Sequence, residues 1–502
     1  MWLRRLIAPV LMTALSCGCA SSARHLSAVA AYDRGQPQEA LQELNAAAAE
    51  RGAEREILQV DEAICQLMAG DTRQAEHTLY AVRQQLEFLS QKDISERATS
   101  YLTDEQAIAW TGREFERRML DCLMMLASLA GDRQDAFAFA TRTSERLQAN
   151  WQQLTKADGD NTVPPAQTVA HSSTDDSIHV VPVAHTSDEQ GSPDRRPAVP
   201  EEFGTNALAA FLIAAVHSEL PMNGDTMREA LQQVGDWQPA AAAGIPDLQI
   251  GMHTPADHGT LHIVTLVGRV TDWQAESVVP SSAALLLADQ ILSANSDHTL
   301  PPTIAPVRIG RPRLDCSHHP GATTVSIAGR DSFGPVTSRT LIDLNHIAAQ
   351  SYLASHDRVV AKAITRRIVK KGVVYATKNQ LDVDRDSNAD LLLSLGGAAW
   401  EALEKPDVRH ARLLPERIEV AMITLPVGSY DVTLGTSEPD AAMANMPSLR
   451  PKQKGPKQNG PKQNGPPGLA ERTTDVTIVN GRNTFVLCFR PQDHISHVVG
   501  GR

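Results

Sequence analysis

A pattern of glycine, alanine and apolar positions repeats along the first third of this 502-residue chain. Each copy places a small residue five positions after a glycine, and an apolar or small residue four positions later: Gly35, Ala40 and Leu44; Gly70, Ala75 and Leu79; Gly131, Ala136 and Ala140. Glycine permits the chain to reverse between two helices, and helical spacing puts the other positions on one face. The pattern predicts three helical hairpins within residues 24–152, which must stack to bury their apolar stripes.

The spacing resembles that of tetratricopeptide repeats, whose period is about 34 residues. The first two copies lie 35 residues apart, and Ala28 and Ala63 precede their glycines at the same offset. The third copy follows an insertion, the closing proline is missing, and three copies make a short array, so a generic stack of helical hairpins is the alternative. Either arrangement predicts a scaffold with a concave face that holds a protein or peptide.

The pattern changes after the repeats. A stretch rich in Ser, Thr, Asp, His and Pro predicts a flexible linker over residues 153–200. The run at 206–220 is the most apolar helix of the chain, but it is too short to span a bilayer. Strand and helix patterns then alternate, with strands at 260–270 and 323–327 and helices at 283–292, 341–354 and 356–371.

Two pairs of strands are predicted towards the C-terminus. Residues 418–425 and 430–434 flank Pro426–Ser429, and residues 475–478 and 483–489 flank Asn480-Gly481, so that each pair is typical of a β-hairpin. The predicted fold class is therefore α+β. Tetratricopeptide-like helical hairpins are followed by a mixed α+β domain over residues 201–502, which ends in a small β-sandwich-like part.

An insertion interrupts this second domain. Residues 452–467 read KQKGPKQNGPKQNGPP, a basic segment rich in proline and glycine with no apolar residue to bury. Such a composition predicts a disordered loop insertion. The alternative is an arm that binds an acidic polymer or surface.

The N-terminus has the features of an export signal. Arg4 and Arg5 precede an apolar run that stops at Ser16-Cys17-Gly18-Cys19. The cysteine at the cut site resembles a bacterial lipobox, which implies a signal peptide over residues 1–19 and lipid attachment at Cys19, with Cys17 as the alternative. An ordinary secretory signal is the other interpretation. Because no acidic residue follows Cys19, the resemblance implies an exported protein anchored in the outer membrane and facing the periplasm.

Charge and cysteine content narrow the class of protein. The chain has 59 acidic and 47 basic residues, a net charge of −12, which argues against nucleic-acid binding. Cys65 and Cys122 lie in apolar helical patterns and are predicted to be small buried thiols. The scattered cysteines beyond the signal form no disulfide framework.

No motif for catalysis, phosphate binding or a dinucleotide occurs in the sequence. Cys316, His318 and His319 lack a fourth ligand and are typical of an exposed turn, so we expect no metal, no cofactor and no enzyme. Glu116 and Arg117 open a helix, where an acidic residue suits the helix dipole. Arg366 and Lys370 share one helix face, either as a solvated face or as a contact for phosphate or polysaccharide. These four residues are the candidate contacts for a partner or anion: Glu116, Arg117, Arg366 and Lys370.

Three segments, 114–142, 341–371 and 411–434, together with the lipobox and the repeats, resemble a family of uncharacterised bacterial lipoproteins with tetratricopeptide-like N-termini. The resemblance implies a role in envelope assembly, without an established activity. The function predicted from the sequence is thus a membrane-anchored envelope lipoprotein that acts as a protein-interaction scaffold. The alternatives are an enzyme acting on the cell wall and a module that binds extracellular polysaccharide.

Overall fold

The computed structural model describes most of the chain between residues 23 and 500. The described ranges are 23–50, 54–99, 109–160, 206–220, 223–243, 255–295, 304–313, 321–329, 334–380, 405–437, 471–492 and 495–500. The signal segment with Cys17 and Cys19, the cluster at 316–319 and the insertion at 452–467 lie outside these residues.

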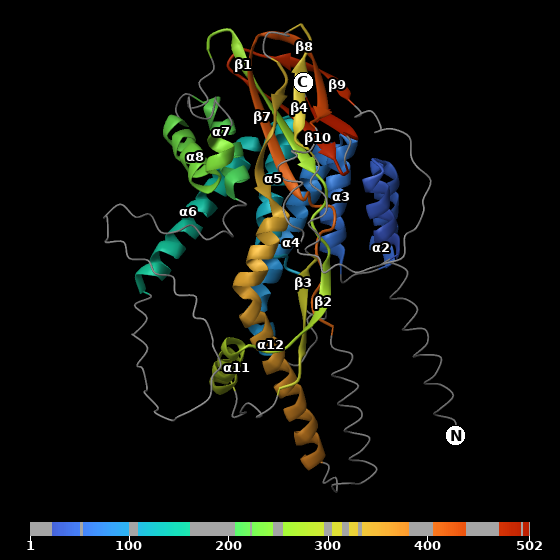
Figure 1. Ribbon diagram of the computed structural model, residues 1–502, viewed down its shortest axis with the longest axis vertical. Coiled ribbons are helices and arrows are strands. Elements are labelled where there is room, and N and C mark those ends of the chain that lie inside the picture. The colour runs from blue at the N-terminus through green and yellow to red at the C-terminus, as the bar shows by residue number, and fades with distance from the viewer. Residues whose placement is uncertain are drawn as a thin grey trace, which may run out of the picture.

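Helices fill the N-terminal half of the chain, which is coloured from blue to green in Figure 1. A helix over residues 23–33 comes first. Eight more follow: α2 (Pro37–Glu50), α3 (Arg55–Ala69), α4 (Thr72–Thr99), α5 (Glu114–Ala130), α6 (Ala136–Asp160), α7 (Asn206–Ser218), α8 (Gly224–Trp237) and α9 (Pro239–Ala243). Helix α6 continues past residue 152, where the sequence predicts the linker to begin. None of the described helices has the length and apolarity needed to cross a membrane.

The three repeated glycines each lie between two helices, as predicted. Gly35 and Gly70 have φ angles of 73° and 87°, which glycine adopts without strain. Gly131 differs, since its φ angle is −101°. Glycine is required there by close approach, because a Cβ atom at this position would lie 2.7 Å from Thr72 Oγ1. The alanines that follow these glycines are buried, as the repeat predicts: Ala40, Ala75, Ala136 and Ala140.

The C-terminal half contains mixed sheets, which confirms the α+β class. Five strands have the order β11-β10-β1-β7-β6 and four have the order β5-β4-β8-β9, with β1 parallel to β10 and antiparallel to β7. The bounds in the first sheet are β1 (His258–Val267), β6 (Arg339–Asp343), β7 (Arg417–Pro426), β10 (Asn483–Arg490) and β11 (His497–Gly500). Those in the second are β4 (Thr323–Ile327), β5 (Val336–Thr337), β8 (Gly428–Thr436) and β9 (Arg472–Ile478).

The five-stranded sheet is covered on both faces. Val264 and Leu266 of β1 belong to the same apolar core as the helices, whereas Leu261 and Ile263 pack with residues of the four-stranded sheet. Alternate side chains of a strand point to opposite faces. The sheet is therefore the middle layer between the helices and the second sheet.

The two predicted β-hairpins are wrong, although their strands exist. β7 pairs with β1 and β6, while β8 pairs with β4 and β9; likewise β9 pairs with β8, while β10 pairs with β1 and β11. The chain passes from one sheet to the other at each connection. The reason is burial, because Leu425 and Val432, on either side of one connection, enter the core between the sheets.

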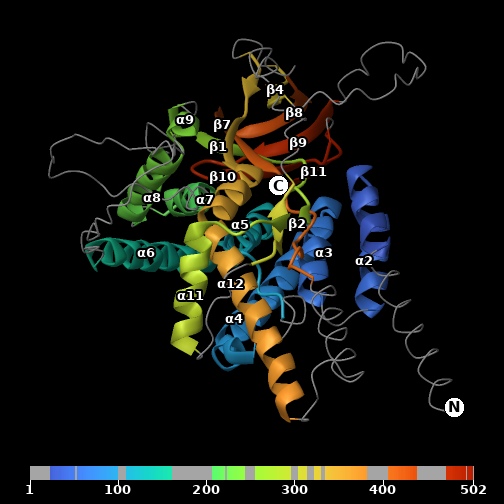
Figure 2. The ribbon, with the colours of Figure 1, turned by 60° about the horizontal axis from the view of Figure 1, so that its bottom comes forward.

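A third packing unit extends away from these layers. The long helix α12 (Leu344–Gln380) packs with α11 (Ser282–Asn295) and with the two-stranded sheet of β2 (Trp273–Val278) and β3 (Val307–Pro312) (Figure 2). The sequence predicts two helices over 341–371, whereas the structure has one, preceded by β6. The helix is continuous because Val360, Ala361 and Ile364 form a core with α11 and β3.

Candidate functional site

A loop from the C-terminal half, residues 405–416, is inserted against the N-terminal helices; we call it the joint loop. Asp61 of α3 is fully buried and accepts hydrogen bonds from the backbone N–H groups of Arg412 (3.2 Å) and Leu413 (2.9 Å). His25 Nε2 lies 2.6 Å from Oδ2 of this carboxylate, the oxygen that also accepts from Arg412. A buried carboxylate needs such partners, and here they join three distant segments.

Glu116 holds the same loop from α5. Its Oε2 accepts from the backbone N–H of Arg113 at 2.6 Å, which caps the helix, and its Oε1 accepts from the backbone N–H of Ala411 at 3.1 Å. The Glu116 side chain is only 2% exposed. The predicted helix-terminal role is thus present, and the same carboxylate also ties the helix to the joint loop, so Glu116 is not accessible as a partner contact.

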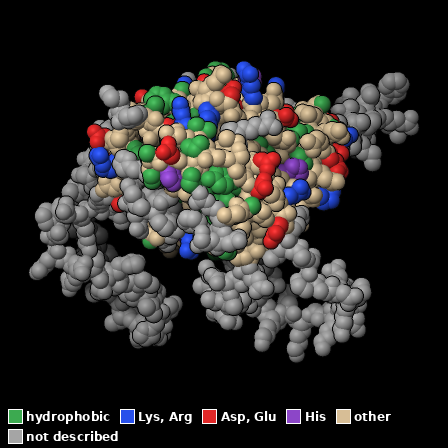
Figure 3. All heavy atoms as spheres, turned by 90° about the horizontal axis from the view of Figure 1, so that it is seen from above, with side chains coloured by type: hydrophobic (Ala, Val, Ile, Leu, Met, Phe, Trp, Pro, Cys, Tyr) green, Lys and Arg blue, Asp and Glu red, His purple; other side chains and the backbone are tan. Residues whose placement is uncertain are grey.

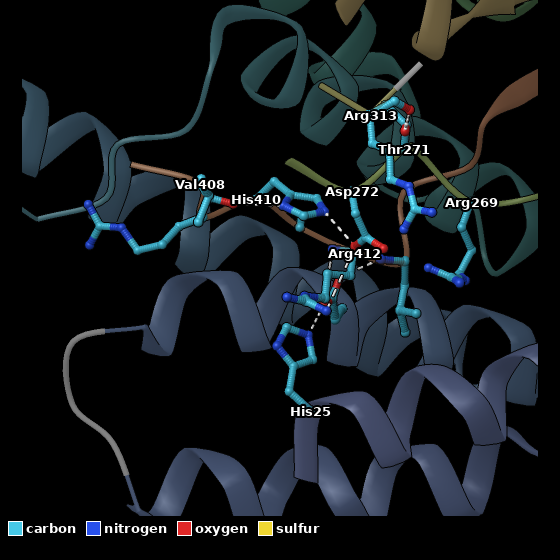
Figure 4. Close-up of polar contacts among 12 residues, drawn as sticks. His25, Arg269, Thr271, Asp272, Arg313, Val408, His410 and Arg412 are labelled. Atoms are coloured by element: carbon cyan, nitrogen blue, oxygen red, sulfur yellow. Dashed lines mark hydrogen bonds and ion pairs between the residues drawn. The ribbon is translucent and has the colours of Figure 1, made fainter. Parts of the chain in front are cut away.

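Asp272 joins the joint loop to the segment after β1. Its Oδ1 lies 3.4 Å from His410 Nε2 and 3.7 Å from Arg412 Nη1 (Figure 4). The hydrogen bond from His410, aided by Arg412, lowers the pKa of Asp272 to about 2. His410 Nδ1 also lies 3.1 Å from the carbonyl oxygen of Val408, and this contact together with the one to Asp272 holds the ring in place.

The helices and the five-stranded sheet meet again at His262 of β1. This buried ring stacks on Phe485 with centroids 4.7 Å apart, and its Nε2 lies 3.0 Å from Asn483 Oδ1. Burial lowers the pKa of His262 to about 4. The Asn483 amide in turn donates to the carbonyl of Ala215 on α7 at 2.7 Å. This contact between the helices and the sheet, which we call the second joint, therefore depends on a neutral histidine.

A charged hollow opens on the helical side of the molecule. Its volume is about 230 Å³, and α4, α5, α6 and α7 line it. The apolar lining residues are Leu86, Leu120, Leu147 and Ala209. The charged ones are Arg83, Glu87, Glu114, Arg117, Arg118, Asp121 and Arg146.

The charges in the hollow are paired with one another. Asp121 pairs with Arg83 at 2.7 Å and with Arg146 at 3.2 Å, and Glu87 pairs with the same two arginines at 3.2 and 2.7 Å. Burial raises the pKa of Asp121 to about 6, against the opposing effect of Arg83. Because several of these side chains are half-exposed, a bound molecule has access to exchange partners with them.

Of the candidate residues from the sequence, only Arg117 lines this hollow, where it pairs with Glu114. Arg366 and Lys370 lie on α12, and both are buried, at 6% and 1% exposure. The expectation of a solvated basic face on that helix is wrong, because the face packs into the protein. The structure does not bring Arg366 or Lys370 to the hollow.

Sequence reasoning missed most of the hollow. The local signals are pairs at helical spacing: Arg83 with Glu87, and Glu114 with Arg117 and Arg118. Asp121 and Arg146 come from two other helices, so their meeting depends on helix packing.

A further carboxylate, Glu76, lines a separate hollow of about 570 Å³, and burial together with Asp135 raises its pKa to about 7.

Other chemistry is sparse in the described ranges. Cys65, Cys122 and Cys488 are buried thiols, as predicted for the first two, and burial raises the pKa of Cys488 to about 12. No group of three or more His, Cys, Asp or Glu residues in these ranges is placed to hold a metal ion. The face seen in Figure 3 intermixes acidic, basic and hydrophobic side chains.

No family model matches the chain, and neither a curated protein nor a solved structure is detectably similar to it.

Proposed function

We propose that this protein is an envelope-anchored lipoprotein that acts as a protein-interaction scaffold. In this proposal lipid at Cys19, or at Cys17, anchors the chain, and the tetratricopeptide-like helices bind a segment of a partner protein in the charged hollow. The observation that carries the proposal is the hollow itself, which combines an apolar floor with charged groups from four helices. Nothing in it depends on nucleic acid or on a cofactor.

The composition of the hollow and its surroundings suits a protein partner. Protein interfaces are enriched in arginine and aromatic residues around an apolar centre. Arg117 and Arg146 are 43% and 36% exposed, and Phe88, next to Glu87 on α4, is 51% exposed. A partner that supplies carboxylates and an apolar side chain would match this surface.

A cross-linking experiment tests the hollow. A photoreactive phenylalanine analogue at position 88 should capture one partner from membranes of the source bacterium, while the same analogue at Leu286, which is 68% exposed on α11, should not. Arg117→Glu should abolish the capture because it reverses one charge of the surface.

The matched control is Arg228→Glu, since Arg228 forms an i, i+3 pair with Asp225 on α8 just as Arg117 does with Glu114 on α5. Capture that is equal from positions 88 and 286, or that Arg117→Glu leaves intact, contradicts a partner in the hollow.

The lipid anchor has its own measurement. Mass spectrometry of the mature N-terminus should show a diacylated Cys19. A diacylated Cys17 would move the site, and an unmodified serine or alanine at the N-terminus would contradict the lipoprotein assignment.

One observation favours the rival class, an enzyme that acts on the cell wall. Asp121 and Glu76 are carboxyl groups in hollows whose pKa values are raised to about 6 and about 7, as general acids require. We propose that neither is catalytic, since Asp121 is paired with two arginines and Glu76 is hydrogen-bonded to Asp135. Purified protein should therefore release no product from peptidoglycan. Turnover that Asp121→Asn or Glu76→Gln abolishes, with the fold intact, would replace the scaffold proposal.

A further inference from the structure

We propose that a second cavity, which shares only Glu114 with the charged hollow, binds a sugar ring of a glycan. It lies where the segment before α5, the start of β2, helix α12 and the joint loop meet, and its volume is about 440 Å³. We call it the aromatic pocket. Its side chains are Trp110, Trp273, Tyr352, Arg113, Asp407 and Arg409, with Glu114, Ser351, Ser355 and Val359 beside them.

Aromatic rings are concentrated in this pocket. The whole chain has only 6 tryptophans and 6 tyrosines, yet three of them line one cavity from segments far apart in sequence. The Trp273 and Tyr352 rings meet edge to face, with centroids 6.4 Å apart. Large rings with a polar tip offer an apolar surface and a hydrogen bond together, which matches a sugar, whose ring carries C–H groups on its faces and hydroxyls at its edge.

Planar polar groups are fixed around these rings. The Arg113 guanidinium lies 3.6 Å from the centroid of the Trp273 ring and donates to the Arg409 carbonyl at 2.6 Å. The Arg409 guanidinium donates to both carboxylate oxygens of Asp407, at 2.9 and 3.0 Å. Groups held in this way are pre-organised, and pre-organisation reduces the cost of binding.

The hydrogen-bonding pattern favours a hydroxylated, uncharged ligand. The charges of Arg113 and Arg409 are accompanied by those of Glu114 and Asp407, so the pocket has no excess charge to attract an anion. Ser351 and Ser355 add polar residues to the lining. A purely apolar ligand would bury polar groups without partners, whereas sugar hydroxyls both donate and accept.

The test uses the mature, full-length protein and four probes: chitotetraose, cellotetraose, maltotetraose and soluble peptidoglycan strands. Intrinsic tryptophan fluorescence and calorimetry should detect saturable binding of at least one probe. Tyr352→Ala should weaken that binding by about tenfold, equivalent to ~1.4 kcal/mol, because it removes one wall. Ser351→Trp should abolish it by filling the cavity.

Tyr80→Ala is the matched control, because Tyr80 is a tyrosine on α4 that does not line the aromatic pocket. It should leave saccharide binding unchanged. Arg146→Glu should also leave it unchanged, because Arg146 lines the charged hollow but neither lines the aromatic pocket nor pairs with Glu114, so this inference and the proposed partner hollow can fail separately. The absence of binding to all four probes at millimolar concentration overturns the inference. Binding that survives both Tyr352→Ala and Ser351→Trp also overturns it, because the ligand would then lie elsewhere.

Discussion

The carboxylates that bind the joint loop and those that line the charged hollow are the same chemical group in opposite surroundings. Asp61 and Glu116 are buried and accept hydrogen bonds from backbone N–H groups of the joint loop. Glu87 and Glu114 are 54% and 41% exposed and pair with arginine side chains. Backbone donors in the interior cannot exchange their acceptor for water, whereas exposed side chains can.

This difference separates the structural role of one glutamate from the proposed recognition role of another within a single helix. Glu114 and Glu116 lie in the first turn of α5, yet the first lines the hollow and the second is sealed against the joint loop. Acidic residues at a helix N-terminus are therefore not equivalent. What distinguishes them is the layer that each side chain faces.

The largest effect is expected from Asp61→Ala. The change leaves His25 and two backbone N–H groups without their acceptor in the interior, and breaking a buried charged contact typically costs ~3–5 kcal/mol. Chemical denaturation should show this loss. Asp61→Asn, which keeps one acceptor oxygen, should cost less. A cost below that of an average surface substitution would show that the joint does not stabilise the fold.

Glu116→Ala should have the next largest effect. It removes both the helix cap and the bond to Ala411, which together suggest a loss of ~2–3 kcal/mol. Glu114→Ala is the matched comparison in the same helical turn and should cost under ~1 kcal/mol. Equal losses in thermal unfolding would erase the distinction between the two glutamates.

The second joint should make stability depend on pH. The pKa of His262 is lowered from 6.5 to about 4 in the folded protein, so the unfolded chain binds the additional proton between these values. The free energy of unfolding should therefore rise with pH through this window, and the contribution is lost as the pH falls towards 4.

Denaturation curves at pH 4.5 and 7 should show a larger difference for the wild type than for His262→Gln, which does not titrate. Asp121 in the hollow has the opposite sign, because its pKa is raised to about 6 and the folded protein holds its proton longer. Asp121→Asn should accordingly steepen the rise with pH. If both variants show the same pH dependence of the free energy of unfolding as the wild type, these assignments are contradicted.

The smallest effect is expected in the hollow. A double-mutant cycle on Glu87 and Arg146, whose side chains are 54% and 36% exposed, should give a coupling free energy below ~1 kcal/mol. The pair Asp225 and Arg228 on α8 provides an exposed reference. A coupling of several kcal/mol would show that the ion pairs of the hollow stabilise the fold, as the contacts of Asp61 and Glu116 do, and would argue against the hollow as a recognition surface.

Local features of this fold were predictable because short-range spacing encodes them. The helix turns at Gly35 and Gly70 and the burial of Ala40 and Ala75 follow from the repeat. The strand at 323–327 matches β4 at both ends. Each feature depends on residues within one or two turns of helix or one strand.

The site was less predictable than these elements. Arg117 was identified from its place at the start of a charged helix, but Arg83, Asp121 and Arg146 reach the hollow only through the packing of α4, α5 and α6. Arg366 and Lys370 illustrate the reverse error, because a polar face on an isolated helix reads as solvated until another layer covers it.

The sequence by itself determined where the N-terminal helices turn, which of their alanines are buried, and the α+β class, since these follow from periodicity and glycine geometry. Tertiary structure alone decided which sheet receives each C-terminal strand and which carboxylate is buried. The physical reason is separation along the chain. The bond from Ala411 to Glu116 spans 295 residues, and only burial of apolar surface by the whole chain brings such partners together.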